Sequence, residues 1–241
     1  MERVILLVSV GNGPALAALA DGLEAGIPDA AVRRVCSGGH GAALDAALAR
    51  LRDEGAAWVD VQPLMLLPGH EYDRLRAALD SRRAEFARLR LGLPLLTGVE
   101  DARRLAAALS RQYPAGEGSL LLAGHGSRHP AGRLYGLLQQ ELLRLGRENA
   151  RIALLTGAPG LEQVFPLLRG RVRLVPLMLE AGRHAACDLA GGHPASWLAR
   201  LRAVGLETEY VPQGLAALPE VGQMFREKLE LLLKIGDESI E

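Results

Sequence analysis

Short apolar runs alternate with longer amphipathic stretches along the whole of this 241-residue chain. The apolar runs are rich in Val, Leu and Ile and are bounded by Gly or Pro, which is typical of buried strands. In the stretches between them, such as 41–55 and 71–91, apolar residues recur every three or four positions, as on a helix with one buried face. The predicted strands are 3–9, 30–36, 56–62, 93–98, 119–124, 150–156, 172–176 and 206–212.

The two halves of the sequence resemble each other. LLVSVGNG at 6–13 matches LLLAGHGS at 120–127, and VQPLMLLPGHEYDRL at 61–75 matches LVPLMLEAGRHAACDL at 174–189. Both matches occur in the same order and at nearly the same offset, so we interpret the chain as an internal duplication. Strand–helix alternation indicates parallel sheet with helices on both sides. The predicted fold class is therefore α/β, with two lobes that each hold a four-stranded parallel sheet flanked by helices.

The same pattern predicts the domain organisation. We expect an N-terminal α/β lobe at 1–99, a connecting helix and linker at 100–118, and a C-terminal α/β lobe at 119–241 that carries the chemistry. The apolar positions of GLLQQELLRLG at 136–146 form a helix face suited to packing against a second subunit, so a homo-oligomer is compatible with the sequence.

Composition excludes several classes of protein. Lys and Arg total 28, as do Asp and Glu, so no net charge attracts nucleic acid or an anionic membrane. The two cysteines, Cys36 and Cys187, make neither a disulfide framework nor a CxxC pattern. The first apolar run is too short for a signal peptide, and none reaches membrane-spanning length. We expect a cytoplasmic protein without nucleic-acid or membrane partners.

Histidines follow two predicted strands of the second half. His125 comes directly after the strand at 119–124, and His184 follows the strand at 172–176 at the start of a helix. Ligands of open parallel sheets bind beyond the carboxyl ends of the strands. Two such ends lie within about 10 Å when at most one strand separates them. Two imidazoles there suit a metal or proton-transfer site, although a histidine in a glycine-rich turn can equally be a packing or capping residue.

The residues around His125 have their own expected roles. Gly124 and Gly126 remove side chains that would crowd a large ligand, and they permit a sharp turn. Ser127 is suited to capping the helix that follows. A hydrolase with Ser127 as its nucleophile is disfavoured, because GHGSRH lacks the Gly-x-Ser-x-Gly elbow.

Charged residues complete the candidate site. Glu71 aligns with His184 in the internal repeat, so it either faces the same region from the first lobe or is a solvated residue in the first turn of a helix. Arg128, Arg133 and Arg183 lie close to the two histidines in sequence and would make their surroundings positive. Such a site suits an acidic ligand.

These motifs resemble a known family. AGHGSRHPAGRLY, VPLMLEAGRHAACDLAG and SWLARLRAVGLETEYVPQGLAALPEVGQMFREKL are similar to segments of the anaerobic-type sirohydrochlorin cobaltochelatases, which belong to the class II chelatase superfamily. VQPLMLLPGHEYDRL resembles their first-lobe motif, Gln-Pro-Leu-His followed by Gly-Glu-Glu-Tyr. The resemblance implies two flavodoxin-like lobes that hold the tetrapyrrole sirohydrochlorin between them. It also implies insertion of cobalt(II) on the cobalamin pathway, without ATP or an organic cofactor.

The resemblance also implies roles for particular residues. His125 and His184 match the two metal-binding histidines and are expected to be catalytic, together with Glu71, which matches the acidic residue of Gly-Glu-Glu-Tyr. We expect the tetrapyrrole to contact Gly124, Gly126, Ser127, Arg128, Met65 and Arg183.

Two positions depart from the family pattern. Thr156 stands where a metal-binding glutamate is usual, and Met65 replaces the histidine of Gln-Pro-Leu-His. Losing a carboxylate removes one anionic ligand and weakens cation capture. Two alternatives therefore stay open: an iron or nickel chelatase that acts on a related tetrapyrrole, and a non-catalytic tetrapyrrole- or haem-binding protein that has lost a metal ligand.

Overall fold

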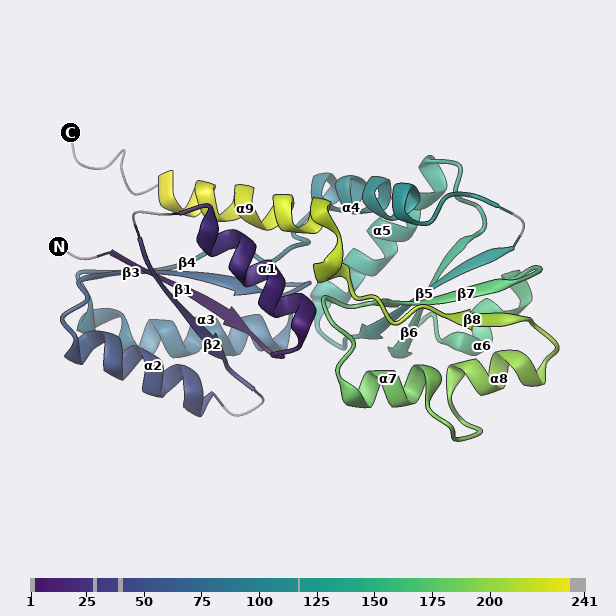
Figure 1. Ribbon diagram of the computed structural model, residues 1–241, viewed down its shortest axis with the longest axis horizontal. Coiled ribbons are helices and arrows are strands. Elements are labelled where there is room, and N and C mark those ends of the chain that lie inside the picture. Colours follow the sequence, from purple (N-terminus) through teal and green to yellow (C-terminus); the bar gives the residue numbers. More distant parts are fainter. Residues whose placement is uncertain (1–2, 28–29, 39–40, 117, 235–241) are drawn as a thin grey trace. The chain divides into compact units, whose positions relative to one another are not determined.

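The chain folds into two compact units, the first formed by Met1–Thr97 with Val221–Glu241 and the second by Gly98–Glu220. The computed structural model describes residues 3–27, 30–38, 41–116 and 118–234, without the side chains of residues 183–185. Figure 1 labels the helices and strands of each unit.

The first unit is built on a four-stranded parallel sheet in the order β2-β1-β3-β4. Its strands are β1 (Arg3–Ser9), β2 (Ala31–Cys36), β3 (Trp58–Leu64) and β4 (Arg88–Leu91). Helices α2 (Ala42–Asp53) and α3 (His70–Arg82) cover one face, and α1 (Pro14–Ala25) and α9 (Pro219–Lys234) cover the other (Figure 1). The core between the sheet and α2 and α3 is aliphatic and contains Leu6, Leu48 and Leu79. A 3₁₀ turn, η1 (Arg83–Glu85), follows α3.

The second unit has the same topology, with a parallel sheet in the order β6-β5-β7-β8. Its strands are β5 (Ser119–Gly126), β6 (Ala150–Thr156), β7 (Val172–Leu177) and β8 (Thr208–Tyr210). Its helices are α4 (Val99–Gln112), α5 (Arg133–Arg144), α6 (Leu161–Val164), α7 (Arg183–Ala190) and α8 (Trp197–Ala203). Three 3₁₀ turns, η2 (Pro130–Gly132), η3 (Phe165–Leu167) and η4 (Leu215–Ala217), lie between them.

The shared topology confirms the predicted α/β fold with two four-stranded parallel sheets flanked by helices. The likeness extends to the loops, because the N–H of Leu95 donates to the carbonyl of Met65 (2.9 Å) and the N–H of Leu215 donates to that of Met178 (2.8 Å). Met65 and Met178 are the equivalent methionines of the two Pro-Leu-Met-Leu motifs. The expected domain boundaries at 99 and 119 stay predictions.

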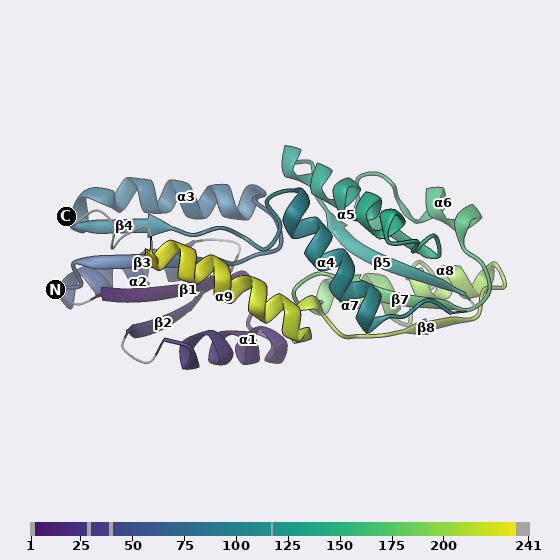
Figure 2. The same ribbon diagram turned by 90° about the horizontal axis from the view of Figure 1, so that it is seen from above.

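The helix that follows each sheet in the chain belongs to the other compact unit. α4 comes after the first sheet in the chain yet belongs to the second compact unit, where it packs on α5. α9 comes after the second sheet yet belongs to the first unit, where Arg226 donates to the carbonyl of Gly22 (3.0 Å). Figure 2, a view from above, shows α9 crossing over the first sheet. The first unit therefore includes α9, which follows the strands of the second sheet, and the second unit includes α4, which follows the strands of the first.

The fourth predicted strand was wrong. Residues 93–98 form no strand, and the helix expected over 71–91 ends at Arg82, so that Arg88–Leu91 form β4 instead. The segment Arg88–Leu91 (RLRL) fitted the helical period of the preceding residues. It forms an edge strand instead, where Arg90 Nε donates to Asp60 of β3 at 2.6 Å. Leu95 and Leu96 are fully buried in an irregular segment whose amides bond to the chain after β3.

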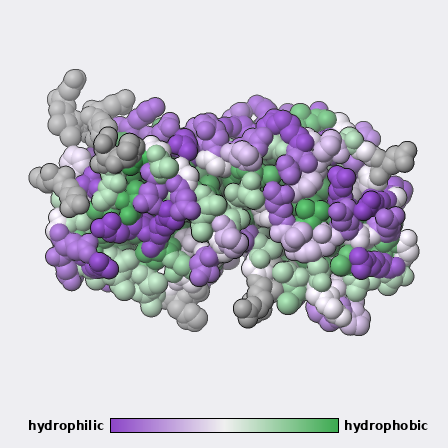
Figure 3. All heavy atoms as spheres, viewed as in Figure 1, coloured by the Kyte–Doolittle hydropathy of each residue, from purple (hydrophilic) through white to green (hydrophobic). Residues whose placement is uncertain are grey.

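No helix in the described part of the chain has the length and apolar composition needed to cross a lipid bilayer. On the face seen in Figure 3, hydrophilic side chains are interspersed with hydrophobic ones over both units.

Candidate functional site

His125 lies at the carboxyl end of β5 with an exposed side chain. Gly124 before it pairs with Leu177 of β7, and Gly126 after it pairs with Thr156 of β6, so the histidine stands between the ends of two neighbouring strands. Its Nδ1 lies 3.3 Å from the carbonyl oxygen of Gly126. When that nitrogen carries the proton and donates to Gly126, the Nε2 lone pair is open to a ligand.

The two glycines around His125 are required by their surroundings. A Cβ at Gly124 would lie 2.8 Å from Leu154 Cδ2 and 2.8 Å from Tyr135 Cε1, inside the packed interior. Gly126 has a φ of +81°, and a Cβ there would lie 1.8 Å from the Thr156 carbonyl oxygen. Both glycines lie within β5, where Gly124 serves packing and Gly126 serves backbone geometry at the end of the strand.

Tyr135 of α5 supports this turn from below and was not assigned a role from the sequence. Its side chain is buried, and burial raises the pKa of the phenol to about 12, while a hydrogen bond with the Gly126 backbone opposes the rise. The phenol therefore stays protonated near neutral pH. The sequence signal was weak, because an aromatic residue on the apolar face of a helix is ordinarily read as core.

Ser127 and His129 shape the chain after His125. The backbone N–H of His129 donates to Ser127 Oγ (3.0 Å), and the N–H of Ala131 donates to His129 Nδ1 (3.1 Å). Ser127 therefore organises the turn two residues on, and His129 rather than Ser127 provides the side-chain cap of η2. The expectation that Ser127 caps the next helix was wrong, because a tight turn and a 3₁₀ segment precede α5. Arg128 beside them is exposed.

Thr156, which replaces the usual glutamate, is exposed at the end of β6 in register with Gly126. The substitution therefore falls directly beside the turn that carries His125. Among the described residues, no three His, Cys, Asp or Glu side chains lie close enough together to hold a metal ion.

The second predicted histidine follows the neighbouring strand. β7 pairs directly with β5, and α7 begins at Arg183 after Gly182, so His184 lies in the first turn of that helix. The side chains of Arg183 and His184 lie outside the described residues. The expected convergence of His125 and His184 on one cation stays a prediction.

The remaining predicted residues belong to the first unit. Glu71 lies in the first turn of α3, half-buried, and forms an ion pair with Arg74 one turn on. Met65 is only 6% exposed and packs in the core of this unit. Burial explains why Met65 is apolar, and its contact with a tetrapyrrole stays a prediction, as does the catalytic role of Glu71.

A sequence model of the family described as Cobalt chelatase (CbiK) matches residues 40–233. The chain belongs to this family. It is 38% identical over 179 residues to the sirohydrochlorin cobaltochelatase CbiKC of Nitratidesulfovibrio vulgaris, a match that covers 70% of this chain and 63% of that protein. It is 32% identical over 198 residues to the sirohydrochlorin cobaltochelatase of Salmonella typhimurium, which covers 80% of this chain and 75% of that protein. The match therefore spans less than two thirds of the Nitratidesulfovibrio protein.

The fold of this cobalt chelatase family member also resembles a solved structure, SirB from Bacillus subtilis with Fe³⁺. The two superpose with a TM-score of 0.71 at 18% identity, over 100% of this chain and 99% of that one. At this identity the likeness supports the two-lobed fold. The resemblance seen in the sequence motifs is thus confirmed at the level of the family.

Proposed function

We propose that this protein is a sirohydrochlorin cobaltochelatase, which inserts cobalt(II) into sirohydrochlorin in cobalamin biosynthesis without ATP or an organic cofactor. The observation that carries the proposal is the exposed imidazole of His125 at the end of a central strand, in a chain that belongs to the cobalt chelatase family. Both relatives compared above bear the name sirohydrochlorin cobaltochelatase.

The chemistry of insertion suits an imidazole. A divalent cation enters the macrocycle as two pyrrole N–H protons leave, so the reaction releases two protons for each metal ion bound. Neutral histidine near pH 7 both binds a cation and accepts a proton. His125 acts through Nε2, with Nδ1 held by the Gly126 carbonyl, and His184 supplies the second imidazole from the neighbouring strand end. Glu71 assists from the first unit.

The proposed tetrapyrrole contacts follow from the acidity of the substrate. Sirohydrochlorin carries eight carboxylates, which guanidinium groups bind with paired N–H donors. Arg128 is exposed three residues after His125 in the chain, and we assign to it and to Arg183 the role of binding a substrate carboxylate. Gly124, Gly126, Ser127 and Met65 complete the proposed contact set. The proposal further includes a cytoplasmic location and no nucleic-acid or membrane partner, and it allows a homo-oligomer.

Thr156 favours a second candidate function. Because the position beside the His125 turn bears a hydroxyl in place of a carboxylate, cation capture there lacks one negative charge. The alternative is a protein that binds a tetrapyrrole or haem without inserting metal, or that inserts iron or nickel into a related tetrapyrrole. Imidazole ligands accept cobalt, iron, nickel and zinc, so donor type does not select among them.

The test is an insertion assay monitored by absorbance, with purified protein, sirohydrochlorin and each of Co²⁺, Fe²⁺, Ni²⁺ and Zn²⁺ in turn. We expect fastest insertion with Co²⁺ and at least a hundredfold loss in His125→Ala and in His184→Ala. His193→Ala is the control, because His193 is exposed in the same unit and its Nε2 lies 3.1 Å from the carbonyl oxygen of Cys187. Full-rate insertion by His125→Ala would refute its role. A change in the tetrapyrrole absorbance spectrum that shows binding, without insertion of any metal, would favour the non-catalytic tetrapyrrole-binding protein.

A further inference from the structure

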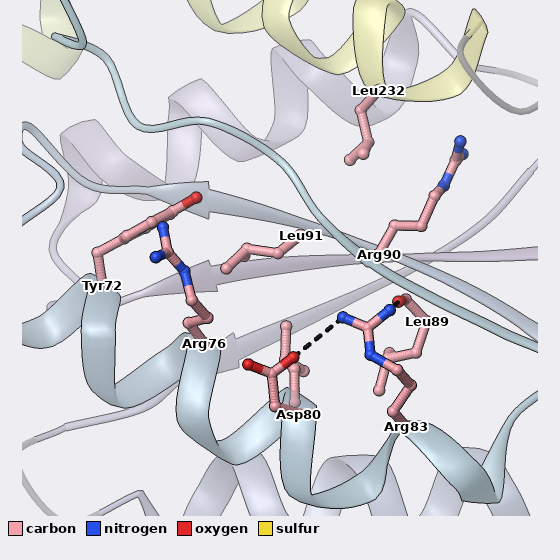
Figure 4. Close-up of a pocket in the computed structure, with 9 residues that line it drawn as sticks. Tyr72, Arg76, Asp80, Arg83, Leu89, Arg90, Leu91 and Leu232 are labelled. Carbon is pink, nitrogen blue, oxygen red and sulfur yellow. Dashed lines mark hydrogen bonds and ion pairs between the residues drawn. The ribbon is translucent and has the colours of Figure 1, made fainter.

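A pocket of about 550 Å³ lies at the outer edge of the first sheet, between α3 and β4 and next to α9. α3 contributes Arg76 to its lining, and the 3₁₀ turn η1 contributes Arg83. β4 contributes the consecutive residues Leu89, Arg90 and Leu91, and α9 contributes Leu232. In Figure 4, Arg76 rises from α3 and Arg83 from the turn that follows it, both beside the strand, and Arg90 extends toward the side on which Leu232 lies. We call this pocket the β4 groove.

The strand borders the β4 groove with its backbone edge. β4 is an outer strand in the described part of the sheet, paired only with β3. The N–H groups of Arg88 and Gly92 donate to Ala57 and Val61 on the β3 side, at 3.0 and 2.8 Å. Because strand residues alternate in direction, the amides and carbonyls of the residues between them, Leu89 and Leu91, point to the open edge. The 3.4 Å contact from Arg83 Nη1 to the Leu89 carbonyl agrees with this direction.

Positive charge is in excess around the groove. Its lining holds three arginines and one acid, Asp80, although the chain as a whole has a net charge of zero. Arg76 lies over the ring of Tyr72 at 5.0 Å and has no acidic partner among the described residues. Arg83 pairs with Asp80 at 3.0 Å, with both side chains more than half exposed. Such an exposed pair is weak and can exchange its carboxylate for another.

Arg90 adds unsatisfied donors on the far side of the groove. Its Nε is bound to Asp60, while its Nη1 and Nη2 are buried and have no hydrogen-bond partner in the described part of the chain. Buried N–H groups without partners are costly. The guanidinium therefore has N–H groups that can donate to an added oxygen atom.

Charges at an outer strand can simply prevent edge-to-edge association. That role requires only a charged, solvated edge, whereas here the open edge lies in a hollow with buried leucines, Leu79 and Leu89, in its lining. We propose that the β4 groove binds an extended acidic segment of a partner protein, which adds to β4 as a further strand. Its backbone pairs with Leu89 and Leu91, its carboxylates pair with Arg76 and Arg83, and its apolar side chains cover Leu91, which is partly buried.

The first test is fluorescence anisotropy of the full-length protein with a labelled hexapeptide of alternating Glu and Val. We expect saturable binding that weakens in 0.5 M NaCl, and none with the Lys–Val peptide. Arg76→Glu with Arg83→Glu should weaken binding at least tenfold. Arg50→Glu with Arg52→Glu, the same charge change on exposed α2 positions, should leave it unchanged. Both double variants should insert metal like the wild type, which separates this site from the proposed chelatase site.

The second test is amide hydrogen exchange followed by NMR, with and without the Glu–Val peptide. Strand addition should slow exchange at Leu89 and Leu91 and change little at Arg88 and Arg90. Absence of saturable binding, or equal weakening by the two double variants, overturns the proposal. Citrate or inorganic phosphate competing as well as the peptide, without amide protection, also overturns it, because the groove would then be a small-anion site.

Discussion

Gly126 and Thr156 pair across β5 and β6 so closely that a Cβ on Gly126 would lie 1.8 Å from the Thr156 carbonyl oxygen. Gly126 also has a φ of +81°, which other residues rarely adopt. The turn that presents His125 is thus held against the neighbouring strand by two constraints that only glycine satisfies.

Gly126→Ala should therefore reduce the free energy of unfolding by about 2–4 kcal/mol and abolish metal insertion, because the added methyl group must displace a backbone carbonyl. Urea denaturation and the insertion assay measure the two effects. Gly136→Ala is the matched control, since that glycine lies within α5 with nothing within 4 Å of an added Cβ. It should raise stability by about 0.5–1 kcal/mol. Equal stability changes in the two variants would contradict the account of the turn.

Thr156→Glu should restore a carboxylate beside the His125 turn. We expect cobalt(II) alone to bind about tenfold more tightly, which corresponds to roughly 1.4 kcal/mol. Isothermal titration with CoCl₂ measures the change. Thr156→Gln has nearly the same shape without the charge, so it should bind cobalt like the wild type. If Glu and Gln have the same effect, the carboxylate at this position is irrelevant to cation capture.

Tyr135→Phe tests the buried phenol under the turn. Removing the hydroxyl deletes the hydrogen bond with the Gly126 backbone and should cost about 1 kcal/mol of stability at pH 8. It should also change the alkaline pH dependence. The pKa of Tyr135 is raised from 10.0 to about 12 in the folded protein. Its contribution is therefore complete below pH 10 and is lost as pH rises toward 12, a change of about 2–3 kcal/mol.

Urea midpoints for wild type and Tyr135→Phe, measured between pH 8 and 12, check this dependence. The wild type should lose stability more steeply than the variant above pH 10, so the two curves cross and the wild type is about 1–2 kcal/mol less stable than the variant near pH 12. Parallel curves would show that the phenol ionises in the folded protein as readily as in the unfolded chain.

Asp60→Asn should destabilise the first unit. Asp60 is 1% exposed and accepts from Arg3 Nε at 2.8 Å and from Arg90 Nε at 2.6 Å. Removing the charge leaves two guanidinium groups around a buried neutral amide, which should cost about 3–5 kcal/mol. Asp53→Asn on the exposed end of α2 should change stability by less than about 1 kcal/mol. Guanidinium chloride denaturation of both variants measures these changes in the free energy of unfolding. A similar small loss of stability in each would contradict the prediction.

The features predicted correctly from the sequence are those set by local pattern. Apolar runs and helical periods identified seven of the eight strands in the described chain, and the Pro-Leu-Met-Leu repeat identified two similar sheets. His125 was placed at a strand end by the run of apolar residues before it and the glycine after it. The family resemblance rested on the same motifs and was confirmed by the family match.

The sequence by itself therefore determined the α/β class, the repeat and the strand end at which His125 stands, because each depends on residues that are neighbours in the chain. Only the tertiary structure decided that Arg88–Leu91 form the fourth strand, since Arg90 finds its partner in Asp60, thirty residues away. It alone placed Tyr135 beneath Gly124 and α9 with the first unit. Those contacts join residues that are distant in sequence. Local periodicity of apolar residues does not predict which partner a buried charge, an aromatic ring or a helix face will contact.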